Sequence, residues 1–222
     1  MSVRVIAIDG PAGAGKSTVA QAVAKRLGFV RVDTGALYRG VALAARERGL
    51  SWQDGAALGA LAGALDLRFE SGEGGPRLHI DGKDRDDELR TTDVAEGASE
   101  VSKHSEVREA LLSVQRRLGE AGGVVLEGRD IGTVVFPDAE VKVFLTASPE
   151  ARADRRYRDL GARGVEADRD ELLRSIQERD KRDSTRALAP LVAAEDAVHL
   201  DSTDLSFDEV VGRIVELAQA RA

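Results

Sequence analysis

A glycine-rich segment near the start of the chain has the residue types and spacing of a loop that binds phosphate groups. Residues 10–17 fit the pattern G-x-x-x-x-G-K-[ST], between an apolar run at 3–8 and an Ala-rich helical pattern. Glycines let such a loop turn its N–H groups around an anion, and the following helix adds the positive end of its dipole. An ordinary glycine-rich turn, the alternative, would need neither the Lys-Ser pair nor the flanking strand and helix. We therefore predict that a phosphate donor is bound by Gly10, Pro11, Ala12, Gly13, Ala14, Gly15, Lys16, Ser17 and Thr18.

Two side chains of this segment have a direct chemical use. The Lys16 ammonium can reach the β- and γ-phosphates of a nucleotide, and the Ser17 hydroxyl can ligate Mg²⁺. The sequence thus predicts a nucleotide with Mg²⁺, in which Ser17 is the metal ligand and Lys16 is catalytic.

Polar side chains also follow two later predicted strands. Asp33 and Thr34 come at the end of the second strand, with Arg39 shortly after them. Arg129 and Asp130 come at the end of the third. Taken alone, Arg129 and Asp130 could form a surface ion pair. Ligands of an open parallel sheet bind beyond the carboxyl ends of its strands, so the combination favours a second anionic ligand beside the nucleotide.

A predicted helix at 167–182 carries charges on its inward face. Helical steps from Ile176 lead to Arg179, Asp183 and Arg186 if the helix persists that far. Charges on such a stripe are stable only when they are paired or line a wet cleft. The alternative is a helix that ends near residue 182 and leaves Arg186 solvated.

The predicted helix at 148–160 is dense in arginine, and Gly161 and Gly164 near its end would allow a hinge. These arginines are either a solvated basic face or a lid that supplies charge and excludes water during phosphoryl transfer. We favour the lid because a phosphate loop is present. The catalytic candidates are then Lys16, Arg129, Arg155 and Arg156.

Composition excludes several classes of protein. The chain of 222 residues has no cysteine, which excludes a disulfide scaffold and thiolate catalysis. Its net charge of −7 argues against a general nucleic-acid binder. No apolar stretch reaches the ~18 residues of a membrane span, and the N-terminal run is too short for an export signal. We therefore expect a cytoplasmic protein with no membrane partner.

The order of predicted elements indicates an α/β fold with a five-stranded parallel sheet and helices on both faces. Residues 50–119 interrupt this alternation with an antiparallel hairpin and two helices. The strands are predicted at 3–8, 29–32, 124–126, 141–145 and 198–200, and the hairpin at 65–80. Helices are predicted at 18–27, from 36, at 91–103, 105–118, 148–160 and 167–182, and from a capping box at 206–209.

Several longer segments resemble the bacterial cytidylate kinase family, the P-loop nucleoside monophosphate kinases that phosphorylate CMP and dCMP. The likeness runs nearly end to end, and the stretch GRDIGTVVFP at 128–137 is highly specific. The other segments are 8–11, 33–39, 107–111, 179–183, 186 and 190–191.

This resemblance implies a P-loop NTPase fold with a core at about 1–49 and 120–222, a monophosphate-binding insert at about 50–119 and a short lid at about 148–166. It implies Mg²⁺-dependent transfer of the γ-phosphoryl group of ATP to CMP or dCMP, in pyrimidine nucleotide metabolism. The expected form is a monomer that acts on small molecules. Two alternatives stay open: a P-loop kinase for another acceptor, such as UMP, AMP or shikimate, and a nucleotide-dependent switch.

The resemblance also implies substrate contacts. Thr34 stands where members of the family often have serine, and it keeps the hydroxyl. The implied contacts are Arg39 and Arg129 for the acceptor phosphate, Ser99, Arg108 and Asp130 for the cytosine ring, and Arg179, Asp183 and Arg186 for the sugar and its surroundings.

Overall fold

The computed structural model describes residues 4–72, 75–162, 164–186 and 188–221. Contacts divide the chain into two compact units, Met1–Phe29 with Gly122–Ala222 and Val30–Ala121. The predicted insert, at about 50–119, begins about 20 residues after the start of the second unit at Val30. The division into units does not test the functional roles of the insert and the lid, which stay predictions. No helix among the described residues is both long enough and apolar enough to cross a membrane.

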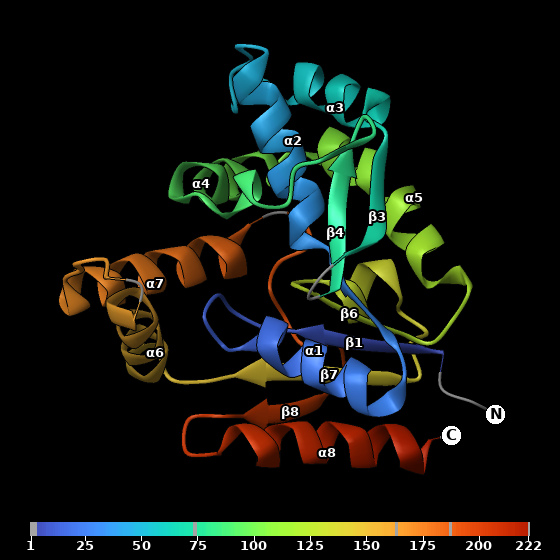
Figure 1. Cartoon of the computed structure of the whole chain (residues 1–222), viewed down its shortest axis with the longest axis vertical. Coiled ribbons are helices and arrows are strands. Elements are labelled where there is room, and N and C mark those ends of the chain that lie inside the picture. Colours follow the sequence, from blue (N-terminus) through green and yellow to red (C-terminus); the bar gives the residue numbers. More distant parts are fainter. Residues whose placement is uncertain (1–3, 73–74, 163, 187, 222) are drawn as a thin grey trace. The chain divides into compact units, whose positions relative to one another are not determined.

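The first unit alternates strands with helices (Figure 1). Its elements are β1 (Val5–Asp9), α1 (Lys16–Leu27), β6 (Val124–Gly128), the π-helix η2 (Ile131–Val135), β7 (Val141–Thr146), α6 (Pro149–Ala162), α7 (Arg169–Thr185), β8 (Val198–Asp201) and α8 (Phe207–Ala220). β1 pairs in parallel with β6 on one side and β7 on the other, and β8 pairs in parallel with β7. With β2 (Val30–Asp33) the sheet has the order β2-β6-β1-β7-β8, so the predicted five-stranded sheet is confirmed.

β1 is the central strand, and all of its residues are buried. A strand with neighbours on both edges and packed faces is expected to be mostly apolar, and the run Val-Ile-Ala-Ile provides this up to Asp9 at its end. α1 packs against β6 and against α8, and α8 also packs against β7. The predicted capping box of α8 is confirmed, because the Ser206 hydroxyl accepts from the Glu209 N–H and the Glu209 carboxylate accepts from the Ser206 N–H.

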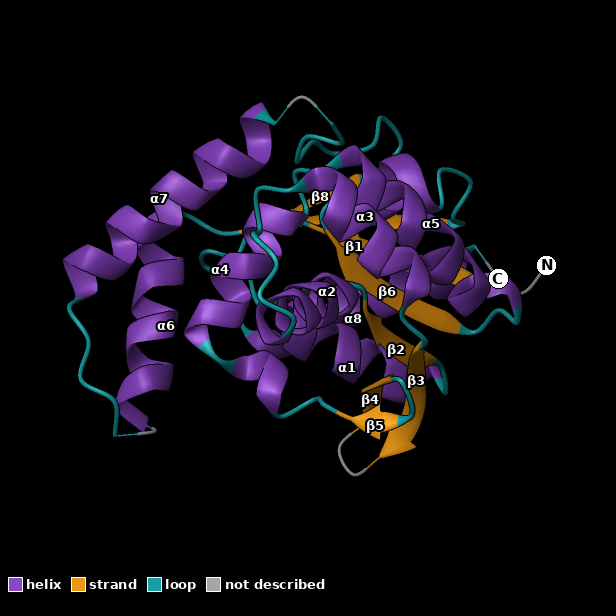
Figure 2. Cartoon of the chain, turned by 90° about the horizontal axis from the view of Figure 1, so that it is seen from above, coloured by secondary structure: helices purple, strands orange, loops and turns teal. Residues whose placement is uncertain are grey.

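α6 and α7 lie side by side in both cartoon views (Figures 1 and 2). α6 begins at Pro149 after the Ser148 hydroxyl, which accepts from the Ala151 N–H at 3.1 Å. α6 runs to Ala162, so Gly161 lies inside the helix and does not end it. α7 extends past residue 182 to Thr185, and Arg186 follows with an extended backbone.

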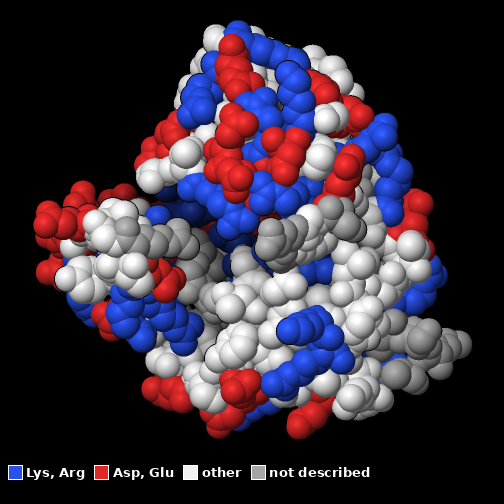
Figure 3. Space-filling view, viewed as in Figure 1, with Lys and Arg blue, Asp and Glu red and all other residues white. Residues whose placement is uncertain are grey.

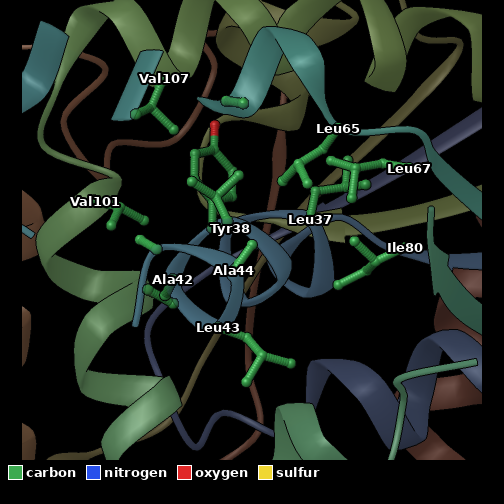
Figure 4. Packing of buried hydrophobic residues seen from close by; sticks show 14 of the residues in the cluster. Leu37, Tyr38, Ala42, Leu43, Ala44, Leu65, Leu67, Ile80, Val101 and Val107 are labelled. Carbon is green, nitrogen blue, oxygen red and sulfur yellow. The ribbon is translucent and has the colours of Figure 1, made fainter. Parts of the chain in front are cut away.

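The second unit is built around α2. Its elements are β2, α2 (Gly35–Glu47), α3 (Gly55–Ala64), β3 (Leu67–Gly72), β4 (Gly75–Ile80), β5 (Lys83–Asp84), the 3₁₀ helix η1 (Glu88–Arg90), α4 (Thr92–Val101) and α5 (Ser105–Glu120). The predicted hairpin is confirmed as β3 and β4, and β5 extends it to a three-stranded antiparallel sheet. α2 packs against α4, and Figure 4 shows Leu37, Tyr38 and Leu43 of α2 among apolar neighbours from other elements of this unit.

α3 was not predicted. Its sequence, GAALGALAGA, has many small residues and no contrast between an apolar and a polar face. The small residues permit close packing on α5, because a Cβ at Gly59 would lie 2.4 Å from the Cβ of Glu106. The helix therefore depends on its neighbour and has no periodic signal of its own.

Basic and acidic side chains both occur across the surface in view (Figure 3). On the second unit some of them pair, as in Arg77 with Asp84 at 2.6 Å and Arg77 with Asp87 at 2.9 Å. Exposed pairs of this kind contribute little to stability.

Candidate functional site

The loop between β1 and α1 has a backbone that requires glycine at defined positions. Gly10 has φ 148°, and a Cβ there would lie 2.0 Å from the carbonyl oxygen of Leu145. Gly15 has φ 86° immediately before α1 begins at Lys16. The loop can therefore approach β7 closely and still present the free N–H groups of the first turn of α1 to an anion.

Lys16 is buried at the start of α1, and its Nζ donates to the carbonyl oxygen of Pro11 at 2.8 Å. Burial lowers the pKa of the Lys16 ammonium well below its ordinary value, and Arg129 lowers it further, whereas Glu127 and Asp9 oppose the shift. The lysine charge is thus held at an energetic cost that a bound polyphosphate would relieve.

Ser17 lies next to a buried carboxylate that the sequence analysis did not single out. The Ser17 hydroxyl donates to Oε2 of Glu127 at 2.6 Å, and Glu127 is only 3% exposed at the end of β6. No cluster of three or more His, Cys, Asp or Glu side chains in the described ranges could hold a metal ion. One hydroxyl and one carboxylate nevertheless fit Mg²⁺, which takes one or two carboxylates and completes its shell with phosphate oxygens and water.

α7 contributes the charges that the helical spacing predicted. Asp183 is buried and accepts from Nε of Arg129 at 3.1 Å. Arg179 lies one turn earlier, and its Nε is buried with no hydrogen-bond partner among the described residues. Burial lowers the pKa of Arg179 to about 10, and the charge of Arg129 adds to this effect. The inward stripe therefore continues to Asp183, while Arg186 lies just beyond the helix and donates to the carbonyl of Ala189.

The arginines of α6 differ in their surroundings. Arg152 is buried and bonds to Asp180, to the Ala147 carbonyl and, at 3.0 Å, to the Ala12 carbonyl of the phosphate loop. Arg155 donates to the Ser202 carbonyl at 2.6 Å and to its hydroxyl at 3.2 Å. Arg156 is exposed. Of the two predicted catalytic arginines of this helix, Arg155 is bonded to Ser202 just after β8 and Arg156 is exposed to solvent.

Four further predicted residues lie in the second unit. Thr34 is buried at the start of α2, where Arg39 forms an ion pair with Asp33 at 2.7 Å. Ser99 is buried on α4, which packs against α2. The Arg108 guanidinium of α5 lies 5.7 Å from the centre of the Tyr38 ring of α2, and it also donates to the Ser102 carbonyl.

A protein-family model described as cytidylate kinase matches residues 6–220. The chain belongs to the cytidylate kinase family. It is 52% identical to the cytidylate kinase of Exiguobacterium sibiricum over 214 residues, which cover 96% of each chain. It is 50% identical to the cytidylate kinase of Pseudomonas aeruginosa over 216 residues, which cover 96% of this chain and 94% of the relative. The family resemblance inferred from the sequence is therefore confirmed.

Among solved structures, an uncharacterized protein from Eubacterium ventriosum shares the fold. It has a TM-score of 0.53 at 13% identity and covers 98% of this chain and 99% of that one.

The site of this kinase includes three residues that the sequence analysis missed. The position of Glu127 at the end of an apolar strand is a signal that could have identified it. The same signal identified Arg129 and Asp130, which lie two and three positions later. Arg152 was recognised only as one of several arginines on its helix. Asp9 lies in the matching segment at 8–11, but the sequence assigns it no role, because its partners lie more than 120 residues away in the chain.

Proposed function

We propose that this kinase transfers the γ-phosphoryl group of ATP to CMP or dCMP, giving ADP and CDP or dCDP. The main support in the structure is the group of cations near the phosphate loop: Lys16 is buried, Arg129 and Arg179 are partly buried, and the charges of both arginines lower the pKa of Lys16. A cluster of this kind is stabilised by a highly charged anion, and phosphoryl transfer requires positive charge around the moving group.

The donor triphosphate binds residues 10–18, with backbone N–H groups and Lys16 around its outer phosphates. Ser17 and Glu127 are the residues that would hold Mg²⁺, which neutralises phosphate charge when it is bound. Arg155 and Arg156 belong to the proposed lid at 148–166, which closes over the donor and excludes water.

The reaction needs no strong base. The attacking oxygen of the acceptor phosphate is already anionic, so it forms a bond to the γ-phosphorus while the bond to the β–γ bridging oxygen breaks and ADP leaves. Catalysis is then positioning and stabilisation of charge by Lys16 and Arg129.

The acceptor assignments follow from the family motifs. The proposed insert at 50–119 provides Ser99 and Arg108. The proposed acceptor residues are Arg39 and Arg129 for the phosphate, Ser99, Arg108 and Asp130 for cytosine, and Arg179, Asp183 and Arg186 for the sugar and its surroundings; Thr34 is proposed to bind the substrate without a more specific role. We further propose that the protein is cytoplasmic and monomeric and has no nucleic-acid or membrane partners. Sedimentation of the purified chain would test its oligomeric state.

An acceptor panel tests the proposal. Release of ADP from ATP is followed with CMP, dCMP, UMP, AMP or shikimate, and without any acceptor. We expect CMP and dCMP to be the best acceptors and hydrolysis without an acceptor to be slow. Faster turnover with AMP or shikimate would reassign the substrate. Hydrolysis that does not depend on an acceptor would instead favour a nucleotide-dependent switch.

A further inference from the structure

Asp9, the last residue of β1, directly precedes the phosphate loop and holds the backbone of a distant segment. Its Oδ1 accepts from the Ile131 N–H at 2.8 Å, and its Oδ2 accepts from the Gly132 N–H at 2.7 Å. These two residues begin η2, immediately after Arg129 and Asp130. One carboxylate therefore joins the start of the donor loop to the segment that carries two proposed acceptor residues.

η2 is a π-helix, a rare geometry that often occurs at functional sites. The first N–H groups of a helix have no acceptor within it, and the Asp9 carboxylate satisfies two of them. At the other end the Lys142 ammonium donates to the Pro137 carbonyl and, at 2.9 and 2.8 Å, to both carboxylate oxygens of Asp196. The segment is thus fixed by a negative charge at its start and a positive charge just past its end.

The packing around Gly132 is close. A Cβ added there would lie 3.2 Å from Cδ of Lys142 and 3.4 Å from Oδ2 of Asp9. Asp9 is 6% exposed, and its pKa is raised to about 6, mainly by burial. The charge of Asp130 contributes to this rise, whereas the two backbone N–H groups and Lys16 oppose it.

A buried carboxylate is a costly way to stabilise a fold, but only a carboxylate offers two acceptor oxygens in this position. An asparagine would accept from one N–H and turn its own NH₂ toward the other. The double contact therefore matters for geometry more than for stability.

We propose that Asp9 is a positioning residue that fixes Arg129 and Asp130 relative to the phosphate loop through the backbone of Ile131 and Gly132. The inference rests on the proposed function, in which Arg129 holds the acceptor phosphate. Asp9 itself touches neither substrate in this proposal.

The test compares Asp9→Asn with Lys142→Met, which removes the contacts of the ammonium with Pro137 and Asp196 but keeps an unbranched side chain beside Gly132. Three quantities are measured in each folded variant: the exchange rates of the Ile131 and Gly132 amides, the affinity for a fluorescent ATP analogue, and the kinetic constants with CMP. For Asp9→Asn we expect faster exchange of the amide that loses its acceptor and a loss of about tenfold or more in kcat/KM for CMP. Donor affinity should stay within about twofold, because removing a negative charge near Lys16 does not weaken an anion site. Lys142→Met should leave exchange at Ile131 and Gly132 slow.

A kcat/KM for CMP within about twofold of the unaltered enzyme would overturn the proposal. An equal loss of donor and acceptor affinity, or a loss in Lys142→Met as large as in Asp9→Asn, would also overturn it. Should Asp9→Asn fail to fold, Gly132→Ala places a Cβ close to Lys142 and to Oδ2 of Asp9 and so disturbs the same contact, and the same acceptor-selective defect is expected.

The two proposals can fail separately. If the unaltered enzyme does not turn over CMP, the proposed function fails. Amide exchange at Ile131 and Gly132 still tests the contact with Asp9, because it needs no substrate.

Discussion

Arg152 connects three segments of the first unit, and its removal should have a large, measurable effect on stability. Its Nε donates to the Ala147 carbonyl at 2.9 Å. Its Nη1 donates to the Ala12 carbonyl and to Oδ1 of Asp180, both at 3.0 Å. The Arg152 side chain is 3% exposed, whereas that of Asp180 is 26% exposed. Breaking a fully buried ion pair costs about 3–5 kcal/mol. Because water can partly rehydrate Asp180, we expect Arg152→Ala to lower the free energy of unfolding by about 3 kcal/mol.

Urea unfolding measures this change, and Arg156→Ala on the exposed side of the same helix is the matched control. The control should change the free energy of unfolding by no more than about 0.5 kcal/mol. Asp180→Asn and the double variant complete a cycle, in which we expect a coupling energy of about 1–3 kcal/mol. A loss below about 1 kcal/mol for Arg152→Ala, or an equal loss for Arg156→Ala, would refute the reasoning.

Four shorter predictions concern activity, motion and pH. Lys16→Met should lower kcat by about 100-fold or more with a smaller change in KM, and near-normal kcat in a folded variant would contradict the role of the loop. Amide exchange in residues 149–162 should slow only when donor and acceptor analogues are both bound, and unchanged exchange would return α6 to the solvated basic face. Asp130→Ala should reduce the ratio of kcat/KM for CMP to that for UMP, because it removes a group proposed to read the base. Arg39→Ala should lower kcat/KM for both acceptors alike, because Arg39 is proposed to bind only the phosphate. Equal losses for the two acceptors in Asp130→Ala would contradict its role. Burial raises the pKa of Asp9 to about 6, so the folded state takes up a proton as the pH falls through 6. This contribution to stability is therefore present at low pH and lost as the pH rises through 6, and urea unfolding at pH 5 and 7.5 should show the unaltered protein gaining stability relative to Asp9→Asn at the lower pH. A pH-independent difference between the two would contradict this prediction.

Several features follow from short stretches of sequence. The phosphate loop is one, because its glycines, Lys16 and Ser17 act through backbone conformation and helix-end charge that the local residues set. The strands of the parallel sheet are another, since a buried central strand such as β1 is marked by a run of apolar residues, here Val5–Ile8. The family could also be recognised from sequence, since its longest matching stretch at 128–137 contains many specific residues in order.

Other features depend on the tertiary structure. α3 forms where small residues meet α5, so its sequence lacks the periodicity that marks an amphipathic helix. The end of α7 was open in the sequence, and the observed helix stops at Thr185, between the two predicted possibilities.

The polar contacts of the site were the least accessible to sequence reasoning. Glu127 meets Ser17, Arg152 meets Asp180 and the Ala12 carbonyl, and Asp9 meets the amides of Ile131 and Gly132. Most of these partners are more than 100 residues apart in the chain. Residue type and spacing therefore identified which side chains could bind phosphate. Only the fold determined which buried charges hold them in place, because a hydrogen bond depends on distance and direction in space and leaves no periodic trace in the sequence.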